Sequence, residues 1–414
     1  MPDRQSFVIV GGGLAGAKAA ETLRSEGFEG KVHLLGEEAE RPYERPPLSK
    51  DYLTGAKPRD SVFVHDEGWY AEHDVELRTG SPVAALHLAE RQVELAGGER
   101  IAFAKALLVT GSSPRRIDVP GADLDGVCYL RRTGDSDALR SALSGGGRRV
   151  VVVGGGWIGL EVTAAARGYG NEVTVVEPQP TVLHAALGAE LGDVFAGLHR
   201  EHGVRLLLGD GVESLQGSAG SVSGVVTSSG EQVAADLVVV GVGARPRTEL
   251  AEAAGLTVDN GVVVDQALRT EHPDVFAAGD VANAFHPLLD RHLRVEHWAN
   301  ALHGGPAAAR SMLGQAVVYD RVPYFFTDQY DLGMEYSGAV GPDGYDQVVY
   351  RGDVAAREFV AFWLKDGRVL AGMNVNVWDV TDPIQALVRS GARVDVDRLT
   401  DPGTTLAEVA AGAR

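Results

Sequence analysis

The sequence predicts an α/β fold with two Rossmann-like dinucleotide-binding domains and a C-terminal α+β domain. The first observation is a glycine-rich loop at 11–16 (GGGLAG), directly after the strand-like residues 7–10. The second is a copy of that loop at 154–159 (GGGWIG), after the strand-like residues 150–153. The third is a change to short strand-like runs without any nucleotide signature from about residue 320 onward. Two such loops indicate two dinucleotides held by one chain, which favours redox chemistry over simple binding.

The elements of the first half follow in order along the chain. Strand 7–10, a helix from Leu14 to about Ser25 and a strand at 32–35 form a βαβ unit. The segment 41–60 is Pro-rich and irregular. Five strand-like runs separated by turns then extend to about residue 110.

The second half repeats this start and then departs from it. We expect a strand at 150–153, a helix at about 158–169, and strands at 173–176, at 236–241 and at 274–280, the last entering a turn. The final part contains short strands at 348–350, 358–363 and 368–372 and one helix near 382–390.

Composition excludes several classes of protein. The formal net charge of −19 argues against a general binder of nucleic acid or anionic membranes. No apolar stretch approaches the roughly 18 residues of a membrane span, and the N-terminus shows no secretory signal, so we expect a cytoplasmic protein. Cys128 is the only cysteine, which excludes an intramolecular disulfide and a multi-cysteine metal site. We read Cys128 as a small buried residue of a strand in preference to a reactive thiol.

Each glycine loop is followed at the expected spacing by an acidic residue at the end of the next strand. For the first loop this is Glu37, with Glu38 as a neighbouring candidate, and for the second it is Glu177. A carboxylate at this position accepts hydrogen bonds from ribose hydroxyls and repels a 2′-phosphate. Glu177 therefore predicts a preference for NADH over NADPH.

Several longer segments resemble one family. They are 41–50 (RPYERPPLSK), 154–161 (GGGWIGLE), 241–246 (GVGARP), 278–280 (AGD) and 295–300 (VEHWAN). Over almost the whole chain, the sequence resembles the FAD-dependent NADH:ferredoxin and rubredoxin reductases, both putidaredoxin reductase-like and dioxygenase ferredoxin reductase-like. The resemblance implies a glutathione reductase-like architecture, with an FAD-binding domain at 1–114 and 245–320, an NADH-binding domain at 115–244 and a C-terminal domain at 321–414.

The resemblance also implies site residues. Lys50 and Glu161 would form a catalytic pair beside the flavin, where the ammonium stabilises negative charge and the carboxylate positions it. Residues implied at FAD are Gly11, Gly13, Leu14, Ala15, Gly16, Glu37, Arg45, Lys50, Val83, Thr110, Gly111, Arg131, Gly279, Asp280, His297 and Trp298. Residues implied at NADH are Gly154, Gly156, Trp157, Ile158, Gly159, Glu161, Glu177 and Gly243. Alternatives stay open for some of these residues: a helix N-cap for Asp280 and a core residue for Trp298. Arg45 and Arg131, and likewise Lys50 and Glu161, could instead be independent surface charges.

The resemblance implies a reaction as well. NADH would give a hydride to FAD, and electrons would pass singly to a [2Fe–2S] or similar ferredoxin that serves a cytochrome P450 or a Rieske oxygenase. Two alternatives stay open: an NADH-dependent flavin reductase of a quinone, monodehydroascorbate or oxygen, and an NADH-sensing flavoprotein like apoptosis-inducing factor. Disulfide chemistry is disfavoured because residues 41–47 contain no cysteine. The histidines show no metal-ligand spacing, and the oligomeric state is open.

Overall fold

The computed structural model describes residues 5–341 and 344–413. Its contacts divide the chain into two compact units, each assembled from three segments. The first unit comprises Met1–Arg45, Arg59–Ser113 and Ala244–Pro323, and the second comprises Pro46–Pro58, Pro114–Gly243 and Tyr324–Arg414.

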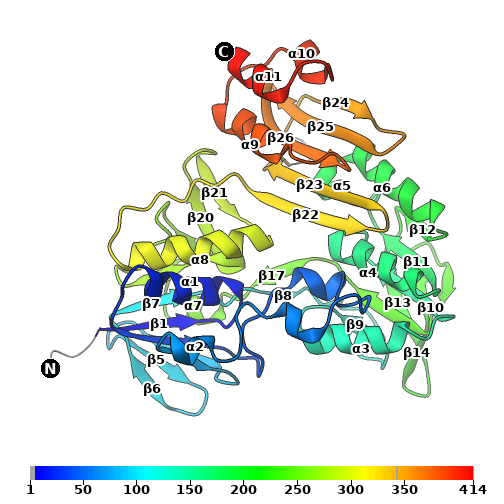
Figure 1. Ribbon diagram of the computed structural model, residues 1–414. Coiled ribbons are helices and arrows are strands. Elements are labelled where there is room, and N and C mark those ends of the chain that lie inside the picture. The colour runs from blue at the N-terminus through cyan, green and yellow to red at the C-terminus, as the bar shows by residue number, and fades with distance from the viewer. Residues whose placement is uncertain (1–4, 342–343, 414) are drawn as a thin grey trace. The chain divides into compact units, whose positions relative to one another are not determined.

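A five-stranded parallel sheet in the order β19-β7-β1-β2-β3 forms the centre of the first unit (Figure 1). Its strands are β1 (Ser6–Val10), β2 (Lys31–Leu35), β3 (Val75–Arg78), β7 (Lys105–Leu108) and β19 (Val275–Ala277). The central strand β1 is apolar and buried from Phe7 to Val10, as expected for a parallel strand covered on both faces.

Helices α1 (Leu14–Ser25) and α8 (Trp298–Met312) pack against each other beside this sheet. Their backbones approach closely, since a Cβ on Gly305 would lie 2.2 Å from the carbonyl oxygen of Ala15. The smaller elements of this unit are β4 (Val83–His87), β5 (Gln92–Leu95), β6 (Arg100–Ala102), β8 (Ser112–Pro114), β17 (Ala244–Pro246), β18 (Val262–Val264), β20 (Ala282–His286), β21 (Arg291–Arg294), α2 (Trp69–Glu72), α7 (Glu249–Ala253) and the 3₁₀ turns η2 (Arg59–Val62) and η3 (Gly279–Val281).

The second unit contains another five-stranded parallel sheet, in the order β12-β11-β10-β16-β9. Its strands are β9 (Val127–Tyr129), β10 (Arg149–Val153), β11 (Glu172–Glu177), β12 (Arg205–Leu208) and β16 (Leu237–Val240). With it come α3 (Thr133–Leu143), α4 (Trp157–Gly168), α5 (His184–Leu187), α6 (Ala189–Glu201), η1 (Pro46–Ser49) and the antiparallel strands β13 (Val212–Ser218), β14 (Ser221–Thr227) and β15 (Gln232–Ala234).

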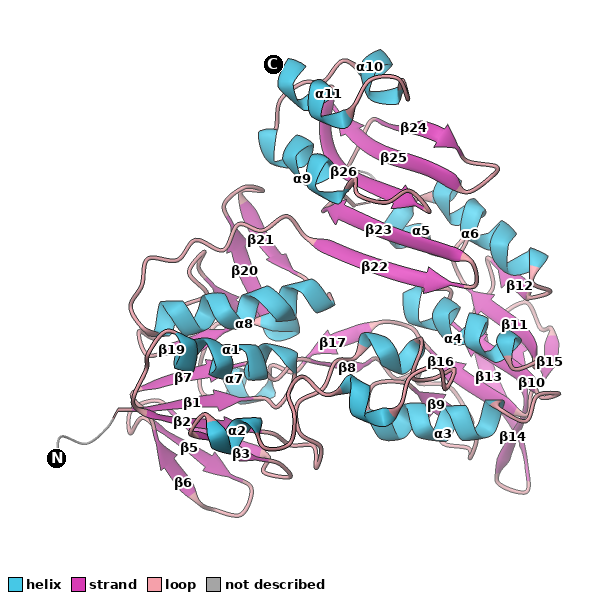
Figure 2. Cartoon of the chain, in the orientation of Figure 1, coloured by secondary structure: helices cyan, strands magenta, loops and turns pink. Residues whose placement is uncertain are grey.

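An antiparallel sheet in the order β22-β23-β26-β25-β24 completes the second unit, and three helices follow it in the sequence (Figure 2). Its elements are β22 (Tyr324–Gln329), β23 (Leu332–Gly338), β24 (Gln347–Asp353), β25 (Glu358–Lys365), β26 (Arg368–Val375), α9 (Thr381–Ser390), α10 (Val396–Thr400) and α11 (Leu406–Gly412). This sheet shares an apolar cluster with helices α4 and α6, because Leu160 and Phe195 lie in the same buried cluster as Trp363 and Met373.

The predicted α/β class and the two βαβ units are confirmed, and α1 has the bounds expected from the sequence. The helix expected near 382–390 is confirmed as α9, but the sequence did not predict α10 and α11, which follow it. These two helices are short, and each depends on a local side-chain cap, from Asp395 and Thr405, more than on a long amphipathic pattern. Cys128 lies in β9 as expected but is only half-buried. The division into three domains remains a prediction.

Candidate nucleotide loops and the Lys50–Glu161 cluster

The first glycine loop joins β1 to α1. Gly11 has φ +130°, and a Cβ there would lie 2.1 Å from the carbonyl oxygen of Val109. At Gly16 a Cβ would lie 2.2 Å from the carbonyl oxygen of Gly11, so this glycine permits close packing of helix on strand. Gly13, at the N-cap of α1, would have no atom within 4 Å of a Cβ. The chain thus leaves open space beside the first amides of the helix, where a pyrophosphate fits.

The second loop repeats this division of roles between β10 and α4. Gly154 has φ +102°, and a Cβ there would lie 2.4 Å from the carbonyl oxygen of Gly241. A Cβ on Gly159 would lie 2.2 Å from the carbonyl oxygen of Gly154. At Gly156, the N-cap, the nearest atom to a Cβ is 3.9 Å away. Both loops therefore have the geometry that a dinucleotide requires.

The two predicted acidic residues are held differently. Glu177, at the end of β11, accepts hydrogen bonds from the backbone N–H of Gly155 at 2.6 Å and of Gln179 at 2.9 Å. These bonds use one lone pair on each oxygen, which leaves acceptor capacity for ribose hydroxyls. Glu37 forms an ion pair with Arg247 at 2.5 Å. Arg247 is a residue that the sequence analysis did not assign, and its carbonyl also accepts a hydrogen bond from Thr110 Oγ1 at 2.8 Å.

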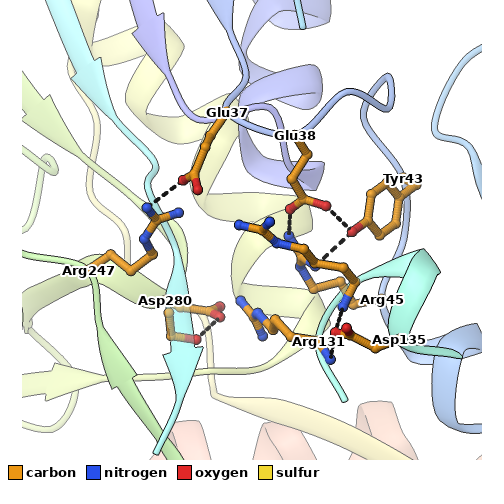
Figure 3. A network of polar contacts seen from close by, with 10 residues as sticks. Glu37, Glu38, Tyr43, Arg45, Arg131, Asp135, Arg247 and Asp280 are labelled. Carbon is orange, nitrogen blue, oxygen red and sulfur yellow. Dashed lines mark hydrogen bonds and ion pairs between the residues drawn. The ribbon is translucent and has the colours of Figure 1, made fainter. Parts of the chain in front are cut away.

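Glu38, Tyr43 and Arg45 form a compact polar group in the first unit (Figure 3). The Tyr43 hydroxyl donates to Glu38 Oε2 at 2.5 Å, and Arg45 Nη2 donates to Glu38 Oε1 at 2.9 Å. Burial raises the pKa of Tyr43 to about 12, so the phenol stays protonated. Burial lowers the pKa of Arg45, but Tyr43 and Glu38 outweigh this effect and leave the guanidinium pKa raised. Arg45 is therefore a fixed positive charge.

Asp280 lies in the 3₁₀ turn η3, which starts at Gly279. The cap residue of that turn is Ala278, so Asp280 is not its N-cap. Its carboxylate accepts a hydrogen bond from Ser112 Oγ at 2.8 Å. His297 is the N-cap of α8, and burial lowers the pKa of its imidazole to about 4 in spite of the opposing charge of Asp280. His297 is consequently neutral at physiological pH.

Lys50 and Glu161 meet in the second unit, as the resemblance implied. Lys50 Nζ lies 2.6 Å from Glu161 Oε1, and the two side chains are 12% and 3% exposed. Two hydroxyls that the sequence analysis did not assign complete this group: Ser49 Oγ donates to Glu161 Oε2 at 2.5 Å, and Thr327 Oγ1 donates to Glu161 Oε1 at 2.6 Å. Ser49 adjoins Lys50 in the Pro-Pro-Leu-Ser-Lys motif, which was a usable signal. Thr327 carries no local signal.

The other predicted residues lie in strands, turns and helices of the two units. Val83 begins β4, where it pairs with Leu95. Gly111 and Gly243 adopt φ +72° and φ +97°, values that favour glycine. Further positions are Ile158, which is 45% exposed, Trp157, whose ring packs edge-on against Phe325, Arg131, whose backbone N–H donates to Asp135, and Trp298, the first residue of α8. The roles of all these residues remain predictions.

Within residues 5–341 and 344–413, no helix is long and apolar enough to cross a membrane. The same residues contain no group of three or more His, Cys, Asp or Glu side chains arranged to hold a metal ion.

Comparisons with known proteins agree with this geometry. Residues 5–305 match the pyridine nucleotide-disulphide oxidoreductase family, and residues 324–410 match the reductase C-terminal domain. The chain is 40% identical to the ferredoxin–NAD(+) reductase component of the anthranilate 1,2-dioxygenase system of Burkholderia cepacia, over 96% of this chain and 97% of that protein. It is 34% identical to the putidaredoxin reductase of Pseudomonas putida, over 100% of this chain and 99% of that protein.

Solved structures give the same result. The chain matches the reductase in a covalent putidaredoxin reductase–putidaredoxin complex with a TM-score of 0.94 and 34% identity, over 99% of each chain. It matches a ferredoxin reductase from Rhodopseudomonas palustris with a TM-score of 0.94 and 35% identity, over 98% of this chain and 100% of that one. The chain therefore belongs to the pyridine nucleotide-disulphide oxidoreductase family, in its group of ferredoxin reductases.

Proposed function

We propose that this protein is an FAD-dependent NADH:ferredoxin oxidoreductase that supplies a cytochrome P450 or a Rieske oxygenase through an iron–sulfur protein. The observation that carries the proposal is the pair of glycine loops, each with space for a phosphate beside a helix N-terminus, in a chain that also holds the buried Lys50–Glu161 pair. The relatives named above act in such systems, which supports the same reading.

The chain's own residues have distinct tasks in this proposal. The first loop, with Arg45 and Asp280, would hold FAD, and the second loop, with Glu177, would hold NADH. FAD, when bound, accepts a hydride and releases the electrons one at a time. Lys50 would stabilise the negative charge that this transfer creates, and Glu161 would keep the ammonium in place.

Disulfide reduction fits these residues poorly. It requires a reactive thiolate, and burial raises the pKa of Cys128, which favours the unreactive thiol. Tyr43 stands in the segment 41–47, which has no cysteine. We also propose a cytoplasmic location, which fits a chain with one cysteine.

The test begins with the purified protein. Bound FAD is identified by absorbance, and the flavin is then reduced anaerobically with NADH. Reoxidation is compared for a panel of [2Fe–2S] ferredoxins, quinones and air. Fast turnover with a ferredoxin supports the proposal. Faster turnover with a quinone would replace it by a small-acceptor reductase, and a long-lived complex without acceptor preference would replace it by a sensor.

A further inference from the structure

A chain of buried hydrogen bonds leads away from Glu161 within the second unit. Thr327 Oγ1 lies 2.6 Å from Glu161 Oε1, and Gln329 Nε2 lies 3.2 Å from Thr327 Oγ1. His199 Nε2 lies 2.9 Å from Gln329 Oε1, and Tyr330 OH lies 3.3 Å from His199 Nδ1. Thr327, Gln329 and His199 are 0%, 1% and 0% exposed. The chain thus joins α4, β22 and α6 through polar groups that water does not reach.

The Glu161 carboxylate at one end fixes which group donates and which accepts at each step of this chain of hydrogen bonds. A carboxylate paired with an ammonium can only accept hydrogen bonds, so the single hydroxyl hydrogen of Thr327 points to Glu161. Thr327 Oγ1 must then accept from the amide NH₂ of Gln329. The amide oxygen of Gln329 consequently faces His199, which must carry its hydrogen on Nε2.

The opposite orientation of the Gln329 amide would place two acceptor oxygens, of Thr327 and Glu161, against each other. If the Gln329 amide were turned around, Thr327 would donate to Gln329, and its oxygen would face the Glu161 carboxylate at 2.6 Å without a hydrogen between them. Burial lowers the pKa of the His199 imidazole to about 4 and keeps the ring neutral with one N–H, which the first arrangement places on Nε2. Its Nδ1 then accepts from the Tyr330 hydroxyl.

An amide in the middle of the chain limits what the chain can do. A side-chain amide does not readily take up one proton and release another, so Gln329 interrupts any proton path from Glu161 to His199. The hydrogen-bond chain can therefore act only by orienting the Glu161 carboxylate. A buried carboxylate that accepts from three donors, one of which is itself held by Gln329, has one favoured position.

We propose that Thr327, Gln329 and His199 are positioning residues, which hold the Glu161 carboxylate and, through it, the Lys50 ammonium in the geometry that hydride transfer from NADH requires. This inference rests on the proposed function of the Lys50–Glu161 pair. Without Thr327, Glu161 would keep Ser49 on Oε2 and Lys50 on Oε1, but it would lose the one donor that ties the carboxylate to β22.

The first test measures the rate of flavin reduction in single turnover. Thr327→Val should lower the rate at saturating NADH about tenfold, the loss expected for one hydrogen bond to a charged group, and leave the NADH concentration for half-saturation unchanged. Thr327→Ser should restore the rate because it keeps the hydroxyl. Thr227→Val is the matched control, since Thr227 is also a fully buried strand threonine of the second unit, and its rate should equal wild type. An unchanged rate in Thr327→Val would overturn the inference.

A second comparison separates this inference from the proposed function. Lys50→Met should slow flavin reduction, and Thr327→Val should then have no further effect in the Lys50→Met background, because Thr327 acts through Lys50. If Lys50→Met slows the reaction and Thr327→Val does not, only the positioning role fails. An unaffected Lys50→Met enzyme would remove the function of the pair, and an additive double variant would show that Thr327 acts elsewhere.

The tautomer of His199 tests the donor and acceptor roles inferred for the hydrogen-bond chain. The ¹⁵N chemical shifts of His199 in the intact protein should show a protonated Nε2 and an unprotonated Nδ1 at neutral pH. Gln329→Leu should remove this tautomer preference and should slow flavin reduction. A Nδ1–H tautomer in the wild-type protein would contradict the arrangement without affecting the proposed function.

Discussion

A side chain that is predicted to bind a ligand can also hold the backbone around it, and Glu177 is the example. Glu177 accepts from two backbone N–H groups, one of them from Gly155 inside the second glycine loop. The same carboxylate that is predicted to select NADH therefore also holds its own loop. Loss of the charge and loss of the loop contact are separate effects that different substitutions distinguish.

We expect Glu177→Ala to lower the ratio of kcat/KM for NADH to that for NADPH, because repulsion of the 2′-phosphate disappears. A shift of about tenfold corresponds to about 1.4 kcal/mol of lost discrimination. Glu177→Gln should shift the ratio similarly but weaken NADH binding less, since its amide oxygen still accepts from the backbone. Glu172→Ala, at the exposed start of β11, is the control. An unchanged ratio in both Glu177 variants would remove Glu177 from the specificity site.

His199 gives a prediction for stability against pH. Burial lowers its pKa from 6.5 to about 4, so between these values the unfolded chain binds more protons than the folded one. Stability from this residue is complete above about pH 6.5 and falls as the pH drops toward 4, by up to about 1.4 kcal/mol per pH unit. Urea unfolding at pH 7 and pH 5 should show a smaller loss for His199→Gln than for the wild type. Equal losses would mean that His199 is not held neutral in the folded protein.

At the scale of elements, the strand–loop–helix unit is used twice with the same distribution of glycines. A Cβ on the first or the last glycine of each loop would meet a backbone oxygen, whereas a Cβ on Gly13 would meet no atom and one on Gly156 only a backbone oxygen at 3.9 Å. The first and last glycines are therefore requirements of folding, and we expect Gly13 and Gly156 to be requirements of the ligand. The short helices α10 and α11 begin instead with a side chain that caps the first backbone N–H groups, from Asp395 and Thr405.

This division predicts different results for two alanine substitutions in the first loop. Gly13→Ala should fold with almost unchanged stability in the absence of FAD, because its methyl group meets no protein atom, but should bind FAD much more weakly. Gly16→Ala should destabilise the protein itself, because its methyl group would lie 2.2 Å from a backbone oxygen. Thermal unfolding of the FAD-free protein and FAD titration measure the two effects. Tight FAD binding by Gly13→Ala would show that the open space does not receive the pyrophosphate.

At the scale of the whole molecule, the sequence order and the compact units do not coincide. Residues 324–414 group with 114–243, and 46–58 joins them across a long separation in sequence. Leu160 and Phe195 share their apolar core with Trp363 and Met373 of the antiparallel sheet. The C-terminal sheet also provides Thr327 to Glu161. The second unit thus has one apolar cluster that joins α4 and α6 to the antiparallel sheet, in addition to the clusters on the parallel strands.

We expect a chain that ends at residue 323 to lose the cooperative unfolding of the second unit, because Leu160 and Phe195 would be exposed to water. Binding of a hydrophobic dye and the width of the thermal transition measure this loss. A chain that ends at residue 403 is the control, since it lacks α11 but keeps the shared core. A cooperative transition and normal NADH binding in the shorter chain would show that the parallel sheet folds alone.

Local pattern was sufficient for the two nucleotide loops. Strand, glycine turn, helix and acidic residue lie within about 30 residues, so short-range sterics and the hydrophobic period determine them. The Lys50–Glu161 pair could be inferred only by resemblance, since no spacing rule joins residues 111 apart. Thr327, Gln329 and His199 could not be inferred, because their partners come from packing between α4, α6 and β22. The sequence alone thus determined two dinucleotide cradles, and only the tertiary structure decided what holds the charge pair, because buried polar partners are selected by which elements pack together.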